Sequence, residues 1–490
     1  MAVTFSDFNF GYADADTELR RSPYLFDVAF YDRKKVVEEL IKGYKFIVLG
    51  RKGVGKSAYG AKIQRLSSQD QEIVSEKVDL SDFEFNTFSR LSSSNQSGAA
   101  RYSISWKMIL LLKIFSVIDK NNLALEHERF QKILKSLKDN GILPNEKLSK
   151  VIRKVSKNGF NISIPYLSDF LSGEVAKEQE TILSNPAEIT ETLLEILEEI
   201  YLGNNKVFII IDGLDDSLRG KSRQLDIVAG LIRAAATLNN ELIDFKLPIK
   251  IIVLARTDIY TTFNDPDLNK VKRDSQISID WNFNFDNPFE SDLYELIKLR
   301  FLTAEEKMEC TIDELWHNLF PEKVEFARTE RDSLSFVIEH TLNKPRDVLQ
   351  FLIECQINYP ENTCLSQNEF LNVLSKYSEN YFLEEMKNEL AGFISDSSIN
   401  AIPGLLSRLG RNRTFTHGQW LSEFNEDPQF KKEDSKMILE MLFDGGYIGQ
   451  LRRRGEHAIP VYKYRESHEK IMLEDRFIIH RGLWKALNMI

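Results

Sequence analysis

The chain has 490 residues, of which 42% are hydrophobic and 28% are charged, and its formal net charge is −10. This composition is typical of a soluble globular protein, and the length predicts about three domains rather than a single core. The negative balance argues against a protein that coats a polyanion along its whole surface, although a local basic patch is compatible with it.

No apolar stretch of the sequence is long enough to span a bilayer, and the first residues lack the basic and apolar regions of a signal peptide. The three cysteines, Cys310, Cys355 and Cys364, show no metal-ligand spacing and suit a reducing compartment. We therefore expect a cytoplasmic protein that makes no contact with a membrane.

Strand and helix patterns alternate along the first part of the chain. An N-terminal segment (1–40) ends in a short helix and leads to an apolar run of strand type at 44–49. Between the second and third predicted strands lies a long, mostly helical insertion of about 100–205, with one short strand at 161–165. The other predicted strands are 73–80, 206–212, 249–256 and 276–281, and the helices between them are 57–66, 224–238 and 260–272. Continuous β-branched runs separated by helices indicate a buried parallel sheet, so the predicted fold class is α/β.

The rest of the chain changes character twice. Residues 286–380 are mostly helical and are predicted to form a lid on the core domain, which comprises 41–285. The last predicted domain, 381–490, has three helical segments followed by two alternating runs, which together predict a winged-helix-like module. These elements are, in order, 399–409, a segment that begins at Thr416, 433–443, 447–451 and 458–464.

The most informative motif is a phosphate-binding loop of the form G-x-x-x-x-G-K-[ST], between the strand at 44–49 and the helix at 57–66. Its glycines let backbone N–H groups converge on phosphate oxygens, and the following helix presents the positive end of its dipole. We expect Lys56 to reach the β- and γ-phosphates and the Ser57 hydroxyl to hold Mg²⁺. The predicted nucleotide contacts are Gly50, Arg51, Lys52, Gly53, Val54, Gly55, Lys56, Ser57 and Ala58.

Acidic residues follow the strand at 206–212. Phosphoryl transfer needs a second Mg²⁺ ligand on a neighbouring strand, and Asp212 ends such a strand. Two further carboxylates come soon after it, and we expect Asp216 to polarise the attacking water, with Asp215 as the alternative. The competing interpretation is that the three aspartates belong to a solvated loop.

Three arginines stand at positions where they could respond to the nucleotide. Arg256 ends the strand at 249–256 and is predicted to sense the γ-phosphate, the alternative being an ion pair with Asp258. Arg273 precedes the last strand, where it could serve a neighbouring subunit as an arginine finger or belong to a solvated basic turn. Arg346, after Pro345, opens a lid helix and is either a reporter of the nucleotide state or a plain helix start.

The order of these features resembles the STAND branch of P-loop ATPases and its NACHT, KAP and origin-recognition relatives, which belong with AAA+ proteins. The run 212–216 is similar to the NACHT pattern, in which a small residue and further acids follow the Mg²⁺ acid. The run 30–33 resembles the motif that lines the adenine pocket, although Asp32 stands where glycine is usual. The resemblance covers about 31–352 and implies ATP and Mg²⁺ as cofactors, with Arg33, Pro345 and Arg346 as further nucleotide contacts.

The whole pattern, with its closing run 479–487, also looks like a poorly characterised group of bacterial P-loop ATPases associated with defence against phage. The sequence shows no nuclease or protease constellation, so we expect an effector or sensor protein to be encoded separately, and Arg273 would act between subunits of an oligomer. The preferred hypothesis is an ATP-driven switch that hydrolyses ATP slowly and forms a homo-oligomer.

Two other classes of function stay open. The first is a DNA-remodelling or DNA-loading ATPase of the origin-recognition type, for which 452–454 would place three arginines at a wing tip. Against it, the candidate recognition helix is acidic, with Glu433, Asp434, Glu440 and Asp444 against Lys436. The second is a nucleotide-dependent scaffold that binds ATP without turning it over.

Overall fold

The computed structural model describes 3–91, 97–143, 148–149, 152–153, 162–165, 180–183, 186–214, 222–263, 265–281, 284, 287–326, 329–454 and 457–489. The chain folds into two compact units. The first unit comprises Met1–Arg33, Gly53–Gly55 and Asp280–Ile490, and the second comprises Lys34–Lys52 and Lys56–Ile279. None of the described helices combines the length and the apolarity needed to cross a membrane.

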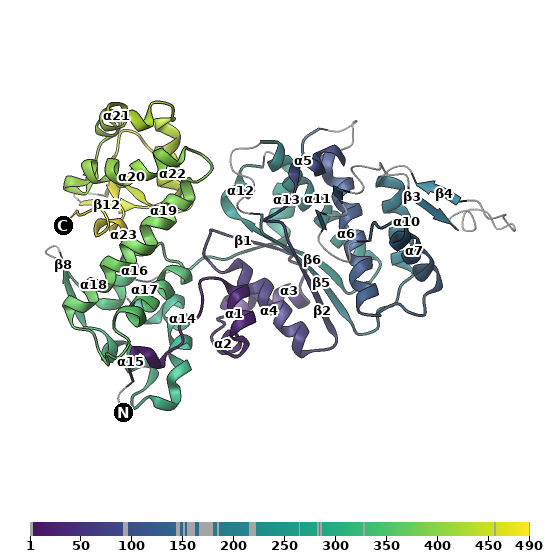
Figure 1. Ribbon diagram of the computed structural model, residues 1–490, viewed down its shortest axis with the longest axis horizontal. Coiled ribbons are helices and arrows are strands. Elements are labelled where there is room, and N and C mark those ends of the chain that lie inside the picture. The colour runs from purple at the N-terminus through teal and green to yellow at the C-terminus, as the bar shows by residue number, and fades with distance from the viewer. Residues whose placement is uncertain are drawn as a thin grey trace. The chain divides into compact units, whose positions relative to one another are not determined.

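A parallel sheet of five strands forms the centre of the second unit, which confirms the predicted α/β class (Figure 1). The strand order is β2-β5-β6-β1-β7, so β1 lies inside the sheet between β6 and β7. Every pairing is parallel. The strands are β1 (Ile47–Gly50), β2 (Ile73–Asp79), β5 (Lys206–Asp212), β6 (Ile249–Arg256) and β7 (Gln276–Ser278). The middle strands are buried on both faces, which explains the apolar runs 207–211 of β5 and 251–255 of β6.

The register of the sheet brings the carboxyl ends of its inner strands to one edge. Gly50 at the end of β1 lies opposite Arg256 at the end of β6. On β5, Ile211 lies opposite Val253, so Asp212 is level with Leu254, two residues before the end of β6. Ligands of open parallel sheets bind outside this edge, which positions the residues of the candidate site.

Helices cover both faces of the sheet. Figure 1 shows α3 and α4 on one side and α6 and α11 on the other. The glycine at 60 lets α4 approach the sheet, because a Cβ there would lie 3.1 Å from Leu254 and 3.2 Å from Ile210. The helices of the second unit are α3 (Val36–Lys42), α4 (Lys56–Gln69), α5 (Phe85–Phe88), α6 (Ala100–Lys120), α7 (Glu128–Asp139), α10 (Pro186–Glu198), α11 (Ser222–Asp244), α12 (Thr257–Thr261) and α13 (Pro266–Ser275).

The helical insertion contributes to the core of the second unit. Helix α6 packs along α11, where Gly230 permits close approach: a Cβ at this position would lie 2.9 Å from the carbonyl oxygen of Ala99. The Trp106 indole donates a hydrogen bond to the Ile227 carbonyl at 2.8 Å across the same contact. The described remainder of the insertion includes an antiparallel strand pair, β3 (Ile162–Pro165) and β4 (Glu180–Leu183).

In the first unit, the N-terminal segment packs against helices that lie far along the sequence. The Gln356 side chain donates hydrogen bonds to the carbonyls of Phe5 and Phe8, and Arg300 pairs with Glu18. Besides η1 (Phe5–Asp7), α1 (Ala15–Arg21) and α2 (Pro23–Val28), this part contains α14 (Asp292–Phe301), α15 (Ile312–Leu319), α16 (Ser333–Glu339), α17 (Pro345–Asn358), α18 (Gln367–Tyr377) and α19 (Leu383–Leu390). Short 3₁₀ segments and the π-helical turn η6 (Ser378–Phe382) connect them.

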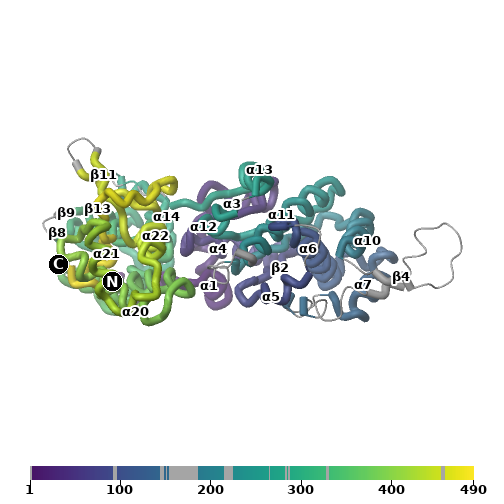
Figure 2. The backbone as a smooth tube through the Cα atoms, turned by 90° about the horizontal axis from the view of Figure 1, so that it is seen from above, coloured from purple at the N-terminus to yellow at the C-terminus, as the bar shows by residue number. Residues whose placement is uncertain are grey.

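The C-terminal part of the first unit combines helices with an antiparallel sheet. The helices are α20 (Asp396–Leu409), α21 (His417–Glu426) and α22 (Ser435–Gly445), and the short α23 (Arg481–Trp484) follows the sheet. The strands, in sheet order, are β10 (Thr414–Phe415), β13 (Arg476–Ile479), β11 (Ile448–Arg454) and β12 (His457–Val461). Figure 2 labels two of these strands, β11 and β13. The description of this part as a winged helix stays a prediction.

Several elements differ from the predicted ones. The helical pattern at 260–272 is two helices, because Asp265 caps a new helix that begins at Pro266. The predicted strand at 276–281 ends at Ser278. The segment 286–380, predicted to be mostly helical, also contains the antiparallel strands β8 (Lys323–Phe326) and β9 (Thr329–Asp332). The strand β13, which pairs with both β10 and β11, was not predicted, since its run is short and its partners lie far away in the sequence.

Candidate nucleotide-binding site

The loop 50–57 has the backbone conformation that its glycines permit. Strand β1 ends at Gly50 and α4 begins at Lys56. Between them Gly53 has a φ of 82° and Gly55 a φ of 93°, in the left-handed region where a side chain is strained. Among the residues that the structure describes, apart from Gly55 and its chain neighbours, no heavy atom lies within 4 Å of the place that a Cβ of Gly55 would occupy. The loop therefore has open space beside its backbone just before a helix N-terminus, which is where an anion is stabilised.

Lys56 stands in the first turn of α4, with only 5% of the residue exposed. Its ammonium donates a hydrogen bond to the carbonyl oxygen of Arg51 at 3.2 Å, so the side chain folds back over its own loop. Burying a lysine is costly unless its charge is compensated. The next residue, Ser57, is half-buried on the same turn.

Asp212, the predicted Mg²⁺ ligand, is the last residue of β5 and is 9% exposed. One carboxylate oxygen accepts a hydrogen bond from the backbone N–H of Gly213 at 2.9 Å. The other lies 2.9 Å from the ammonium of Lys77 on the neighbouring strand β2. A cation therefore already stands at this carboxylate, and carboxylate and hydroxyl oxygens are the ligands that Mg²⁺ prefers. The donor set of Asp212 and Ser57 fits Mg²⁺ chemically.

The small residue after Asp212 has a structural reason. Gly213 has a φ of +78°, and a Cβ at this position would lie 2.1 Å from a carboxylate oxygen of Asp79 and 2.7 Å from the backbone nitrogen of Ser81. Both the backbone conformation and the crowding exclude larger residues. Glycine at 213 therefore lets the backbone adopt a left-handed conformation directly after the acid.

Arg256 ends β6 and is 8% exposed. Its guanidinium makes a two-pronged contact with Asp258, at 2.9 Å from Nε and 2.7 Å from Nη2, so the ion pair weighed from the sequence is present. Desolvation opposes ionisation of Asp258, but the charge and hydrogen bonds of Arg256, aided by the charge of Lys56, hold its pKa below the ordinary value. The three charged groups thus influence one another at the end of the sheet.

The other predicted residues of the second unit lie in different settings. Arg51 and Lys52 in the loop and Ala58 on α4 are half-buried, whereas Arg273 is exposed in the last turn of α13. Asp215 and Asp216 lie outside the described residues. Lys77 was not foreseen, because a lysine inside a strand gives no indication in the sequence of which acid it will meet.

In the first unit, the residues of the predicted adenine motif are fixed by one carboxylate. Asp292, the first residue of α14, accepts a hydrogen bond from the Tyr31 hydroxyl at 2.9 Å and lies 2.6 Å from Nε of Arg33. Desolvation, with the hydrogen bond and charge of Asp292, raises the pKa of Tyr31 to about 12. The Tyr31 ring also packs against Trp281, 5.9 Å between centroids. The Trp281 indole in turn donates a hydrogen bond to the carbonyl of Val54 at 2.9 Å.

Asp292 and Trp281 were missed by the sequence analysis. Asp292 follows the helix cap Ser291, and an acidic residue is common in the first turn of a helix. Trp281 is explained from the sequence as a core residue. Only their contacts with Tyr31 and Val54 connect them to the predicted motifs.

Pro345 and Arg346 open α17, as expected from the sequence. The buried carboxylate of Asp347 accepts hydrogen bonds from the Leu342 backbone and the Tyr381 hydroxyl, both at 2.8 Å, and so fixes the helix start. Within the first unit, a Cβ at Gly53 would lie 3.3 Å from Lys344 Cδ and 3.7 Å from Arg346 Cβ. Glycine at 53 therefore also permits close packing against this helix start.

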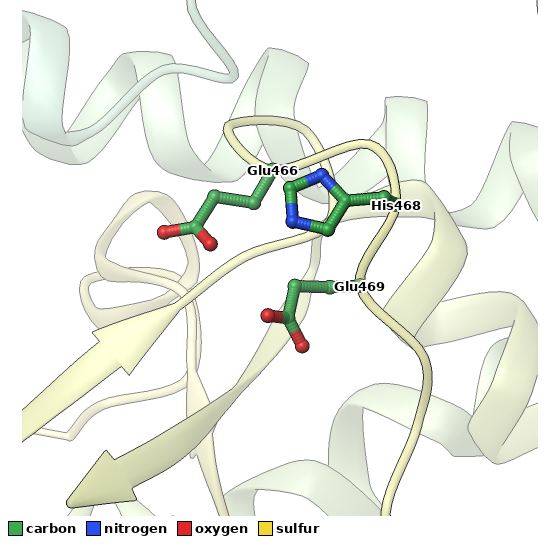
Figure 3. A group of neighbouring side chains, drawn as sticks. All are labelled: Glu466, His468 and Glu469. Carbon is green, nitrogen blue, oxygen red and sulfur yellow. The ribbon is translucent and has the colours of Figure 1, made fainter.

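Among the described residues, one group of side chains is spaced to share a metal ion (Figure 3). The ligand atoms of Glu466, His468 and Glu469 all lie within 4.8 Å of one another, in the loop after β12. Glu469 also lies 3.0 Å from the guanidinium of Arg452, and the group is half-buried or exposed. The ion pair with Arg452 gives this carboxylate a partner, so the cluster has an explanation that needs no metal.

The second unit therefore has the features of a P-loop NTPase-like α/β protein: a parallel sheet, a buried lysine at the start of the helix after β1, and a carboxylate at the end of β5. Residues 291–384 match the family described as the FunZ-associated C-terminal helical domain. This match covers α14 to the start of α19, less than half of the chain.

Two further similarities concern nearly the whole chain. It is 22% identical over 475 residues to the "Putative transposon gamma-delta 80.3 kDa protein" of Escherichia coli (strain K12). The aligned region is 90% of this chain and 62% of that relative, so the chain spans about three fifths of the relative's length. Among solved structures, the Aeropyrum pernix ORC1 protein in complex with DNA is similar over 96% of this chain and 92% of its own, with 10% identity and a TM-score of 0.35. So low a TM-score does not establish a common arrangement of the elements.

Proposed function

We propose that this chain binds ATP with Mg²⁺, hydrolyses it slowly, and changes conformation with the bound nucleotide. The observation that carries the proposal is the loop 50–57, with two left-handed glycines and a buried lysine, at the sheet edge where β5 also ends in Asp212. The loop amides and Lys56 would bind the phosphates, and Ser57 and Asp212 would hold Mg²⁺. The metal would neutralise the charge that develops on the transferred phosphoryl group.

The other charged residues complete the proposed reaction. Arg256 would give up part of its ion pair with Asp258 and direct guanidinium N–H donors toward the γ-phosphate. Asp216, with Asp215 as the alternative, would orient the attacking water. The exposed Arg273 would serve the site of a neighbouring subunit, which makes the active form a homo-oligomer.

Calorimetry with ATP or ADP in the presence of Mg²⁺ tests the binding step directly. We expect binding by the natural chain, loss of turnover in Lys56→Ala, and no change in Lys132→Ala, whose exposed lysine pairs with Glu128 on α7. Phosphate release is measured on the same samples. Absence of binding by the natural chain, or equal turnover in Lys56→Ala, would remove the proposal. Binding without any phosphate release would favour the nucleotide-dependent scaffold instead.

The switch and its assembly depend on the STAND-like resemblance, whereas a role in phage defence, with a separately encoded effector or sensor, depends on the resemblance to the defence-associated bacterial ATPases. Mass photometry with and without nucleotide measures the assembly. We expect larger species with ATP and Mg²⁺ than with ADP, and Arg273→Ala should lower turnover without changing nucleotide affinity. A monomer under all conditions would contradict the assembly while leaving ATP binding intact.

A DNA-remodelling or DNA-loading ATPase is the alternative, and the name of the curated relative, a transposon protein, favours it. The wing arginines support it only in part. Arg452 is paired with Glu469 at 3.0 Å and Asp475 at 3.2 Å, whereas Arg453 is exposed. This alternative requires tight binding of duplex DNA at moderate salt that falls steeply as salt rises and is weakened by Arg453→Glu. Binding that ignores this charge reversal would count against it.

A further inference from the structure

The ion pair between Lys77 and Asp212 concerns the carboxylate on which Mg²⁺ binding depends in the proposed function. The two side chains lie on adjacent strands, β2 and β5, and each is 12% exposed. The ammonium nitrogen of Lys77 lies 2.9 Å from one carboxylate oxygen of Asp212. The opposite oxygen accepts the N–H of Gly213. Both oxygens of Asp212 are thus engaged.

This pairing is set by the sheet itself. Strands β2 and β5 run parallel with Lys77 opposite Ile210 and Asp79 opposite Asp212. The backbone of Lys77 therefore lies two residues before the position opposite Asp212, and its long side chain covers that distance along the strand. Since β2 is an edge strand of this sheet, its lysine can reach the carboxyl edge from the side.

We propose that Lys77 takes the place of the metal at Asp212 in the nucleotide-free chain, so that Mg²⁺ and the Lys77 ammonium compete for one carboxylate. The proposal rests on the proposed function, because it assumes that Asp212 holds the Mg²⁺ that accompanies the nucleotide. Mg²⁺ can bind Asp212 fully only when the ammonium has moved away, because two cations at one carboxylate repel each other. In the absence of Mg²⁺, the Lys77 ammonium neutralises the Asp212 carboxylate. Nucleotide binding therefore depends less on Mg²⁺ than it would if Asp212 had no lysine partner.

The natural measure of this competition is the gain in nucleotide affinity that Mg²⁺ provides. It is the ratio of the ADP dissociation constant in EDTA to that in saturating Mg²⁺, both obtained by calorimetry. Lys77→Met removes the competing charge but keeps an unbranched chain of similar length. We expect the ratio to rise about tenfold in Lys77→Met, by tighter binding in Mg²⁺, and to stay near the natural value in Lys77→Arg, which keeps the charge.

A second buried lysine provides a matched control. Lys113 on α6 lies 2.9 Å from Glu76, also a residue of β2, and its side chain is 9% exposed. Lys113→Met therefore removes a buried charge that pairs with a carboxylate of β2, without touching Asp212. We expect no change in the Mg²⁺ ratio, and an equal rise in both variants would overturn the proposal.

A double-mutant cycle separates the competition from a general effect. In chains that carry Asp212→Asn, the added substitution Lys77→Met should leave the Mg²⁺ ratio unchanged, because there is no carboxylate to compete for. If Lys77→Met instead weakens ADP binding or leaves the ratio as it is in the natural chain, the proposal is wrong although ATP binding stands. If the natural chain binds no nucleotide, the proposed function and this inference fail together.

Discussion

The buried ion pair between Glu18 and Arg300 joins the N-terminal segment to the helical part of the first unit. The atoms Arg300 Nη1 and Glu18 Oε2 lie 2.9 Å apart, and the side chains are 8% and 4% exposed. The same carboxylate oxygen accepts the backbone N–H of Tyr12 at 3.0 Å. Replacing the glutamate, as in Glu18→Ala, leaves the guanidinium buried without its counter-charge.

Breaking a buried pair from one side costs about 3–5 kcal/mol, a large part of the roughly 5–15 kcal/mol by which domains are stable. We therefore expect Glu18→Ala to lower the free energy of unfolding of the first unit by about that amount. Glu330→Ala breaks the pair of Lys323 and Glu330, whose side chains are 59% and 61% exposed, and should cost less than about 1 kcal/mol. The double replacement Glu18→Leu with Arg300→Met should recover most of the loss.

Tryptophan fluorescence in a urea titration is the suitable assay. Trp281, Trp316, Trp420 and Trp484 lie in the first unit and Trp106 in the second, so the signal reports mainly on the unit that carries the substitution. A Glu18→Ala midpoint no lower than that of Glu330→Ala would refute the reasoning. It would mean that residues 1–33 contribute little to the stability of the part that matches the FunZ-associated helical domain.

Three further predictions concern pH, the turn after the acid, and the loop. Burial lowers the pKa of His340 to about 3 and that of His480 well below its ordinary value, so both are neutral in the folded unit and gain protons on unfolding below about pH 6.5. The free energy of unfolding should therefore fall between about pH 6.5 and 4, by up to about 1.4 kcal/mol per pH unit for each histidine, and His340→Leu should flatten that slope in urea titrations. Gly213→Ala should destabilise the second unit by more than about 1 kcal/mol in thermal unfolding followed by circular dichroism, and a neutral result would contradict the crowding at this turn. Trp281→Phe removes the donor to the Val54 carbonyl, and calorimetry should show nucleotide affinity about fivefold weaker; unchanged affinity would show that this hydrogen bond does not support the loop.

The strands of the second unit could be predicted because their information is local. Buried runs such as 207–211 and 251–255 are apolar without interruption, and parallel strands buried on both faces require that pattern. The insertion of β1 between β6 and β7 could not be predicted in the same way, because strand order depends on how helices of many residues pack against the sheet. The short strands β8, β9, β10 and β13 were missed for a related reason, because each is a strand only by virtue of its hydrogen bonds to a partner strand.

The same distinction between local and long-range information applies to the residues of the candidate site. The loop lysine and the acid at the end of β5 could be recognised within a few neighbouring residues, whereas the partners of these groups could not. Lys77 meets Asp212, and Asp292 meets Tyr31 and Arg33, only after distant segments fold together. Asp258, two residues after Arg256, was the exception, because a pair so close in sequence can be proposed from spacing alone.

The sequence by itself determined that a glycine loop with Lys56 follows a strand and precedes a helix, and that an apolar strand ends in Asp212. Those features depend on local backbone conformation and on the side chains of adjacent residues. Only the tertiary structure decided that a lysine from the edge strand neutralises that aspartate and that the N-terminal segment completes the C-terminal helical unit. Such pairings arise because burial in a packed core makes each isolated charge or open apolar face unfavourable, and the partner that relieves it can come from anywhere along the chain.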